Sequence, residues 1–318
     1  MEDGVLGGQG PDSRIRDVAS PLVSSRLACS RCTLRCTKLR GVAGQLVALW
    51  HLTSLDAPTV AAVWALAIAR CAHLHLKPWI LFLLAGVTWT VYVMDRLLDA
   101  RRAINARDLV VLRDRHLFHW RHRRWLVPIA FCTAIAAVGL VVSRMPSVAC
   151  KHDSILAAAA LAYFSGVHAK TRFPRWLRRL GSKEMLVGIL FASGCAAPTL
   201  SRLHSTESIR LVILSLTCLA LLAWLNCAAI STWESQATST NFPVAAALLA
   251  VSGLAIAIVI PPALALTSGL LSCAAISSLL LLALHVSRNR LSPITLRALA
   301  DLVLLVPAVM LIPGALSG

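Results

Sequence analysis

The chain consists of long apolar runs separated by short polar connections. Nine such runs follow one another, each near the roughly 20 residues that a helix needs to cross a bilayer. They span residues 57–76, 79–97, 125–142, 154–169, 184–201, 209–230, 243–262, 264–285 and 296–315. The pattern predicts an all-α membrane bundle of about nine transmembrane helices.

Prolines mark two of the predicted boundaries. Pro58 falls in the first turn of the first run, where proline is tolerated, and Asp56 just before it can cap the helix. Pro261 and Pro262 interrupt an apolar stretch that is too long for one crossing. Because proline cannot continue a helix without losing a hydrogen bond, this pair predicts a tight hairpin.

Residues 1–48 differ from the rest of the chain, since they are polar and basic and contain no long apolar run. The apolar core of 7 to 15 residues that defines a signal peptide is missing there. We therefore expect a disordered cytoplasmic extension, followed by one transmembrane domain over residues 49–318. Cys29, Cys32 and Cys36 in the extension have metal-ligand spacing, but no second CxxC or histidine pair accompanies them, which favours a solvated tail.

Composition supports the membrane assignment, because 58% of the residues are hydrophobic and only 14% are charged. Soluble domains have about 45–50% and about 25%, respectively. The net charge of +17 comes from blocks of Lys and Arg in the tail and in alternate loops, as the positive-inside rule produces, so a nucleic-acid partner is not expected. The remaining loops carry Lys77, Arg144, Lys151, Arg202 and Arg210. This asymmetry predicts a multi-pass protein of the cytoplasmic (inner) membrane with its N-terminus inside.

Two carboxylates four residues apart, Asp95 and Asp99, appear where the second apolar run ends. On a continuing helix they lie on one face, one turn apart, and can hold a single cation. Mg²⁺ is commonly bound by one or two carboxylates together with substrate phosphates. The alternative is that both merely pair with Arg96, Arg101 or Arg102 at a helix end.

Two further groups are predicted on the same side of the membrane. The loop after the fourth run carries Lys170, Arg172 and Lys183, whose charges suit a phosphate. Asn226 and Glu234 lie at the end of the sixth run, where the following loop contains no Lys or Arg. The positive-inside rule therefore does not explain why the sixth run ends in an acidic residue.

The order of these elements resembles the UbiA superfamily of intramembrane prenyltransferases, which carries two Asp-rich motifs after its second and sixth spans. Asp95 and Asp99 match the last two acids of the first motif, while Val91 and Tyr92 stand where its Asn and first Asp would be. In the second motif the first and last positions are Asn226 and Glu234. Cys227 and Ile230 replace the two inner acids.

The resemblance implies Mg²⁺-dependent transfer of a prenyl group from a prenyl diphosphate to a lipophilic acceptor in the membrane. It implies that Asp95, Asp99 and Glu234 bind Mg²⁺, that Tyr163 acts with Asp95 and Asp99 in catalysis, and that Lys170, Arg172, Lys183 and Asn226 bind the diphosphate. Each missing carboxylate removes a metal ligand, which predicts a single metal ion or a weak site. The alternative is a non-catalytic relative that uses the same bundle to bind lipid or a partner.

Three further features of the sequence bear on function. His116, His119 and His122 are spaced so that they drift around a helix, which favours a basic segment on the membrane surface over a metal site. Arg297 and Asp301 lie four apart in the last run and can pair with each other. A transporter is less favoured, because the polar groups gather at one surface and not at mid-membrane.

Overall fold

The computed structural model describes residues 42–105, 113–168, 183–203, 205–235 and 241–312. Every regular element in these ranges is helical. The α-helices are α2 (Val42–Leu52), α3 (Asp56–Cys71), α4 (Pro78–Asn105), α5 (Asp114–Arg121), α6 (Arg123–Arg144), α7 (Ser147–His168), α9 (Lys183–Leu200), α10 (Thr206–Ser235), α11 (Asn241–Val259), α12 (Ala265–Ser287) and α13 (Pro293–Val303). Short 3₁₀ turns are η1 (Pro262–Leu264), η2 (Arg288–Arg290) and η3 (Val306–Leu311).

The chain is an all-α bundle with several helices that can cross a membrane. Among the described residues, five helices are long and apolar enough to do so. They are Pro78–Asn105, Arg123–Arg144, Thr206–Glu234, Asn241–Val259 and Pro262–Arg290. The pair formed by α2 and α3 would make a sixth if its two parts, bent by 92°, act as one span. The count of nine spans stays a prediction, although a helix occupies each of the nine apolar runs.

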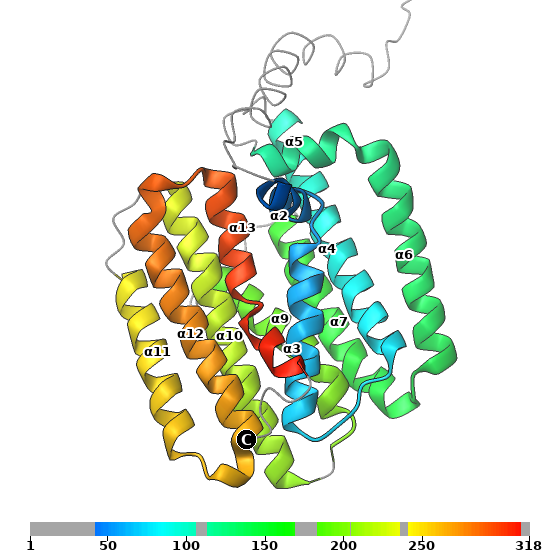
Figure 1. Ribbon diagram of the computed structural model, residues 1–318. Helices are drawn as coiled ribbons and strands as arrows, with labels where there is room; N and C mark the ends of the chain where they lie inside the picture. Colours follow the sequence, from blue (N-terminus) through cyan, green and yellow to red (C-terminus); the bar gives the residue numbers. More distant parts are fainter. Residues whose placement is uncertain (1–41, 106–112, 169–182, 204, 236–240, 313–318) are drawn as a thin grey trace, which may run out of the picture.

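The helices stand side by side, with α6 and α11 on opposite flanks (Figure 1). Helix α4 packs against α3, α5 and α6, whereas α10 packs against α9 and α12. The short helices α2 and α5 lie together at one end of the bundle, and they contact each other. We call this the α5 end, because the predicted polar residues of α4 and α10 lie toward it.

Two local features follow the sequence closely. Helix α11 ends at Val259 and α12 begins at Ala265, so Pro261 and Pro262 form the predicted hairpin between them. Gly188 lets α9 and α10 approach, since a Cβ there would lie 2.7 Å from the carbonyl oxygen of Ala220. Only glycine fits that contact without moving a helix.

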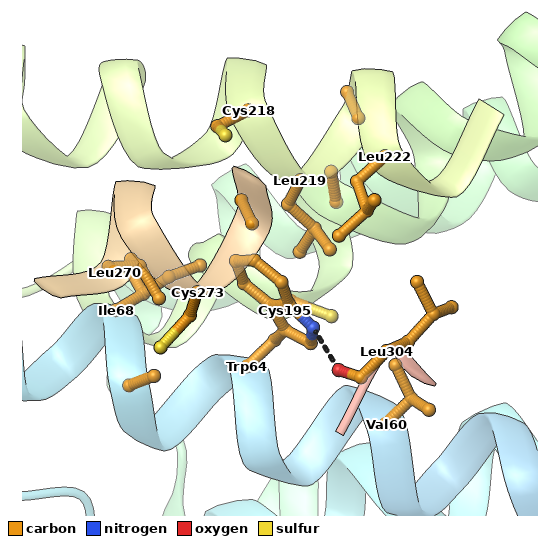
Figure 2. Close-up of a cluster of buried hydrophobic side chains, with 14 of the residues drawn as sticks. Val60, Trp64, Ile68, Cys195, Cys218, Leu219, Leu222, Leu270, Cys273 and Leu304 are labelled. Carbon is orange, nitrogen blue, oxygen red and sulfur yellow. Dashed lines mark hydrogen bonds between the residues drawn. The ribbon is translucent and has the colours of Figure 1, made fainter. Parts of the chain in front are cut away.

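The core lies where α3, α10 and α12 meet (Figure 2). Trp64 is fully buried there among Ile68, Leu219 and Leu270, and its indole Nε1 donates a hydrogen bond to the carbonyl of Leu304 at 2.9 Å. This bond ties α3 to the segment after α13, 240 positions later. A buried indole N–H needs such a partner, so the contact fixes the end of the chain against the core.

Both ends of the chain depart from simple spans. Helix α2 begins at Val42, before the boundary predicted at residue 48, and residues 1–41 lie outside the described part. The last apolar run is not one helix, since α13 stops at Val303 and η3 follows. Pro307, which has no N–H to donate, stands in the first turn of η3 and prevents continuation as an α-helix.

Candidate functional site at the α5 end

Asp95 and Asp99 lie on α4, which continues unbroken through both residues to Asn105 as predicted. Both side chains are half-buried. Their spacing puts the two carboxylates on one face of the helix. The donor set is therefore suited to a hard cation such as Mg²⁺.

Tyr163, on α7, is half-buried, and Asp95 and Glu184 are close enough to act electrostatically on its hydroxyl. Two of the predicted catalytic residues, Tyr163 and Asp95, therefore lie near each other. Lys170 and Arg172 lie outside the described residues, and Lys183 is the first residue of α9. Their predicted contact with a diphosphate stays a prediction.

Glu234, in the last turn of α10, faces three guanidinium groups. It forms an ion pair with Arg297 of α13, and its carboxylate oxygens lie 3.6 Å from Arg113 and 3.9 Å from Arg115. The sequence suggests that Arg297 can pair with Asp301 on its own helix, but its ion pair is with Glu234 instead. Glu234 as a metal ligand stays a prediction, and it would require these ion pairs to open.

Asn226 is buried on α10, about two helix turns before Glu234, and it contacts a carboxylate outside both acidic motifs. Its Nδ2 donates to Asp301 Oδ1 at 3.0 Å. Its Oδ1 is also buried and has no hydrogen-bond partner among the described residues. An unsatisfied buried carbonyl oxygen is costly, so this position suits a bound water or ligand.

Asp301 belongs to a buried cluster that sequence reasoning missed. Its Oδ2 lies 3.2 Å from Nδ1 of His51, and Asp56 Oδ2 lies 2.7 Å from the same nitrogen. Within the described part of the chain, these three residues are the one group of three or more His, Cys, Asp or Glu ligand atoms that lie within 4.8 Å of one another. Asp95, Asp99 and Glu234 do not form such a group there.

Arg96, buried on α4, completes the cluster. Its Nη1 donates to the carbonyl of His51 at 3.1 Å, and its Nη2 lies 3.7 Å from Asp56 Oδ2. The sequence allows Arg96 to pair with Asp95 or Asp99, whereas in the structure its guanidinium contacts His51 of α2 and Asp56 of α3. No spacing rule links residues 51, 56, 96 and 301, since tertiary packing alone brings them together.

The histidines of α5 face the protein, and the contact of this basic segment with the membrane surface stays a prediction. His116 and His119 are buried, and Ser54 in the bend between α2 and α3 contacts His119. The pKa of His119 is lowered to about 4, chiefly by burial and also by the charge of Arg96, although a hydrogen bond to the Arg115 carbonyl opposes the shift. Burial, followed by the charges of Arg115 and Arg96, lowers the pKa of His116 to about 3. Both rings are therefore neutral at pH 7.

Comparison of the chain with family models, curated proteins and solved structures gives no match.

Proposed function

We propose that this chain is a membrane-embedded, UbiA-like prenyltransferase that moves a prenyl group from a prenyl diphosphate to a lipophilic acceptor. In this reaction the bond between the prenyl carbon and the diphosphate oxygen breaks, and a bond from the acceptor to that carbon forms. The acceptor loses a proton, and diphosphate leaves. The protein must therefore stabilise the negative charge of the leaving group.

The observation that carries the proposal is the meeting of two distant helix ends. Arg113 and Arg115 reach Glu234 at the end of α10, and the helix that begins beside them, α5, packs on α4. Leu117 and Trp120 of α5 pack against Ala100 and Ala103 of α4, in the turns that follow Asp95 and Asp99. Acidic side chains from the second and sixth apolar runs thus lie toward the same end of the bundle, and several arginines surround Glu234 there.

The residues present fit one magnesium ion. Asp95 and Asp99 offer two carboxylates on one helix face, and Mg²⁺ usually completes its six ligands with water and phosphate oxygens. Bound there, Mg²⁺ would supply Lewis-acid stabilisation of the departing diphosphate. Lys170, Arg172 and Lys183 are proposed to neutralise the same group, with Tyr163 beside the reacting carbon.

The proposed setting is the cytoplasmic membrane, with the N-terminus and the α5 end inside. The basic residues of the tail and of the loops around residues 106–124 and 170–183 support this orientation. The diphosphate would then approach from the cytoplasm, while the prenyl tail and the acceptor stay in the membrane.

Binding of farnesyl diphosphate to the full-length protein in nanodiscs tests the proposal. We expect Mg²⁺-dependent binding that Asp95→Asn and Asp99→Asn each weaken at least tenfold, because each removes a metal ligand. Glu207→Gln, an exposed neutralisation at the opposite end of α10, is the matched control and should bind like the parent. If the parent and both Asp variants bind farnesyl diphosphate equally well, the proposal that the protein is a prenyltransferase is rejected.

One observation favours the alternative, a non-catalytic relative that binds lipid. An apolar groove of about 310 Å³ lies between α12, α13 and η3, and it has no lining residue from α4. Its lining residues are Leu280, Ala283, Leu284, Ser287, Leu299, Leu302, Val303 and Val306. If a lipid chain without a diphosphate binds there, substitution of Ala283 by Trp should abolish lipid binding and leave Mg²⁺-dependent diphosphate binding unchanged.

A further inference from the structure

His51, Asp56 and Asp301 present three ligand atoms to one point. The Nδ1 of His51 lies 2.7 Å from Asp56 Oδ2 and 3.2 Å from Asp301 Oδ2. Donor atoms bound at about 2.1 to 2.2 Å and at right angles to each other lie about 3.0 Å apart. The two distances from His51 Nδ1 therefore match two edges of one face of an octahedral metal site, and all three ligand atoms lie within 4.8 Å of one another.

The outer oxygen of each carboxylate is held from outside the cluster. Asp56 Oδ1 accepts a hydrogen bond from the backbone N–H of Ala57 at 2.9 Å, and Asp301 Oδ1 accepts one from Asn226 Nδ2 at 3.0 Å. Each Oδ2 is thus aimed at the imidazole. Outer-shell hydrogen bonds of this kind fix the orientation of metal-binding carboxylates.

Asp301 is the most accessible of the three residues. The side chains of His51 and Asp56 are only 2% and 3% exposed, whereas that of Asp301 keeps 17% of its surface accessible. The buried Oδ1 of Asn226, which has no hydrogen-bond partner among the described residues, belongs to the same amide that contacts Asp301. A water molecule bound to a metal could donate to this oxygen.

The bend that carries two of the ligands is held firmly. Ser54 has a left-handed backbone, with φ 60°, and its hydroxyl contacts the buried ring of His119. Trp89 Nε1 donates to the carbonyl of Thr53 at 3.0 Å, and Arg96 donates to that of His51. Backbone strain held in place by buried contacts is typical of preorganised sites.

We propose that His51 Nδ1, Asp56 Oδ2 and Asp301 Oδ2 bind one divalent first-row transition-metal ion of the Mn²⁺ or Fe²⁺ type. One imidazole nitrogen with two carboxylate oxygens suits these ions better than Mg²⁺ or Ca²⁺, which prefer oxygen alone. The two carboxylates carry a charge opposite and equal to that of the ion. The guanidinium of Arg96, with Nη2 3.7 Å from Asp56 Oδ2, adds one positive charge beside the site and also donates to the carbonyl of His51.

This site is distinct from the Mg²⁺ site proposed on Asp95 and Asp99. The competing interpretation is a protonated His51 that bridges the two carboxylates, with no metal. Because the Asp95 and Asp99 pair offers no nitrogen ligand, a bound paramagnetic ion distinguishes the two sites. Mn²⁺ is also a better probe than Zn²⁺, since the ten cysteines of the chain favour zinc.

The experiment is electron paramagnetic resonance of full-length protein titrated with Mn²⁺ in nanodiscs. We expect the parent to show nitrogen hyperfine coupling from a directly bound imidazole. Asp301→Asn and His51→Gln should lower the affinity of this site at least tenfold, whereas Asp99→Asn should leave it intact. Asn226→Ala, which removes an outer-shell contact, should weaken it by about 10- to 100-fold.

Absence of Mn²⁺ binding with nitrogen coupling in the parent would overturn the proposal, whether or not the variants fold. Coupling that persists in His51→Gln would also overturn it, because another nitrogen would then be the ligand. Neither result depends on prenyl transfer, which Asp95→Asn and Asp99→Asn test separately. Loss of both diphosphate binding and the Mn²⁺ site in Asp99→Asn would argue that a single metal site serves the whole α5 end, and it would refute the second site.

Discussion

The hydroxyl of Ser54 lies 3.0 Å from Nε2 of His119, which joins two positions 65 residues apart. The other ring nitrogen, Nδ1, lies 2.7 Å from the carbonyl oxygen of Arg115, so it carries the proton and Nε2 accepts from the Ser54 hydroxyl. A neutral imidazole is therefore built into the contact between α5 and the α2–α3 bend. Protonation of Nε2 would reverse this hydrogen bond, because the Ser54 hydroxyl would then have to accept it, and would place a positive charge in a buried site.

The first prediction concerns pH. His119 has a pKa of about 4 in the folded protein, and an unfolded histidine has one near 6.5. The unfolded state thus binds a proton at pH values where the folded state does not. Stability should be fully present above pH 6.5 and should fall as the pH is lowered toward 4, by on the order of 3 kcal/mol.

Thermal unfolding of the parent and of His119→Gln, between pH 7.5 and 4.5, measures this effect. Glutamine cannot titrate, so the variant should lose less stability on acidification. His116→Gln serves as a second variant, because His116 also has a lowered pKa. Identical pH slopes for the parent and both variants would contradict the prediction.

Ser54 itself provides the second prediction. Ser54→Ala removes the hydroxyl but keeps a Cβ in the left-handed conformation, so we expect a loss of about 1 to 3 kcal/mol from an unsatisfied buried nitrogen. Ser54→Gly loses the same hydrogen bond, but glycine adopts φ 60° without steric cost. Glycine should therefore be less harmful than alanine by about 1 kcal/mol, measured as the unfolding midpoint in denaturant. A glycine variant less stable than the alanine variant would show that the bend is not strained.

The sequence predicted the elements of this fold better than the contacts between them. Apolar run length predicted the helices, and Pro261 with Pro262 predicted the α11–α12 hairpin, since both depend on local rules. The continuation of α4 through Asp95 and Asp99 was also predicted from the local sequence. Pro307 was overlooked as a reason for the last run to break after α13.

The candidate sites depend on long-range packing, which spacing does not encode. Arg297 and Asp301 satisfy the four-residue rule for a helical pair, yet Arg297 pairs with Glu234, because α10 brings a carboxylate closer. Asp56 was predicted as a helix cap, but α3 begins at Asp56 with Leu55 as its N-cap, and no side chain caps the helix. Asp56 instead accepts from the N–H of the next residue, Ala57, while its second oxygen faces His51. His51 gave no signal, since nothing local marks its partner 250 residues away.

A third prediction uses the close approach of α9 and α10. In Gly188→Ala the new methyl would lie 2.7 Å from the Ala220 oxygen and 2.9 Å from the Trp224 nitrogen, both backbone atoms. The helices must separate, at a cost of about 1 to 3 kcal/mol. Gly194→Ala is the matched control on the same helix, because its methyl would meet nothing within 4 Å. The control should be neutral or stabilising by up to about 1 kcal/mol, and equal destabilisation of both variants would refute the packing argument.

A fourth prediction concerns the bond that fixes the end of the chain. Trp64→Phe keeps an aromatic ring in the core but leaves the Leu304 carbonyl without its donor. We expect a loss of about 1 to 3 kcal/mol, seen as a lower unfolding midpoint. Trp125→Phe, at a position that is 73% exposed, should change stability by less than about 0.5 kcal/mol. A parent-like Trp64→Phe protein would mean that the bond contributes little.

The last prediction decides how Glu234 acts. Its carboxylate lies among Arg297, Arg113 and Arg115, where it competes with any anionic ligand for the same guanidinium groups. Glu234→Gln removes that competitor. We therefore expect farnesyl diphosphate to bind more tightly to this variant in the absence of Mg²⁺, with a steeper dependence on salt, because charges near the surface are screened by ions. Glu207→Gln, at the other end of α10, should show no gain and controls for the general change in charge.

If Glu234 is instead a ligand of the proposed Mg²⁺ ion, Glu234→Gln would weaken Mg²⁺-dependent binding and give no gain without the metal. Calorimetric titration of both variants with and without Mg²⁺ separates these roles.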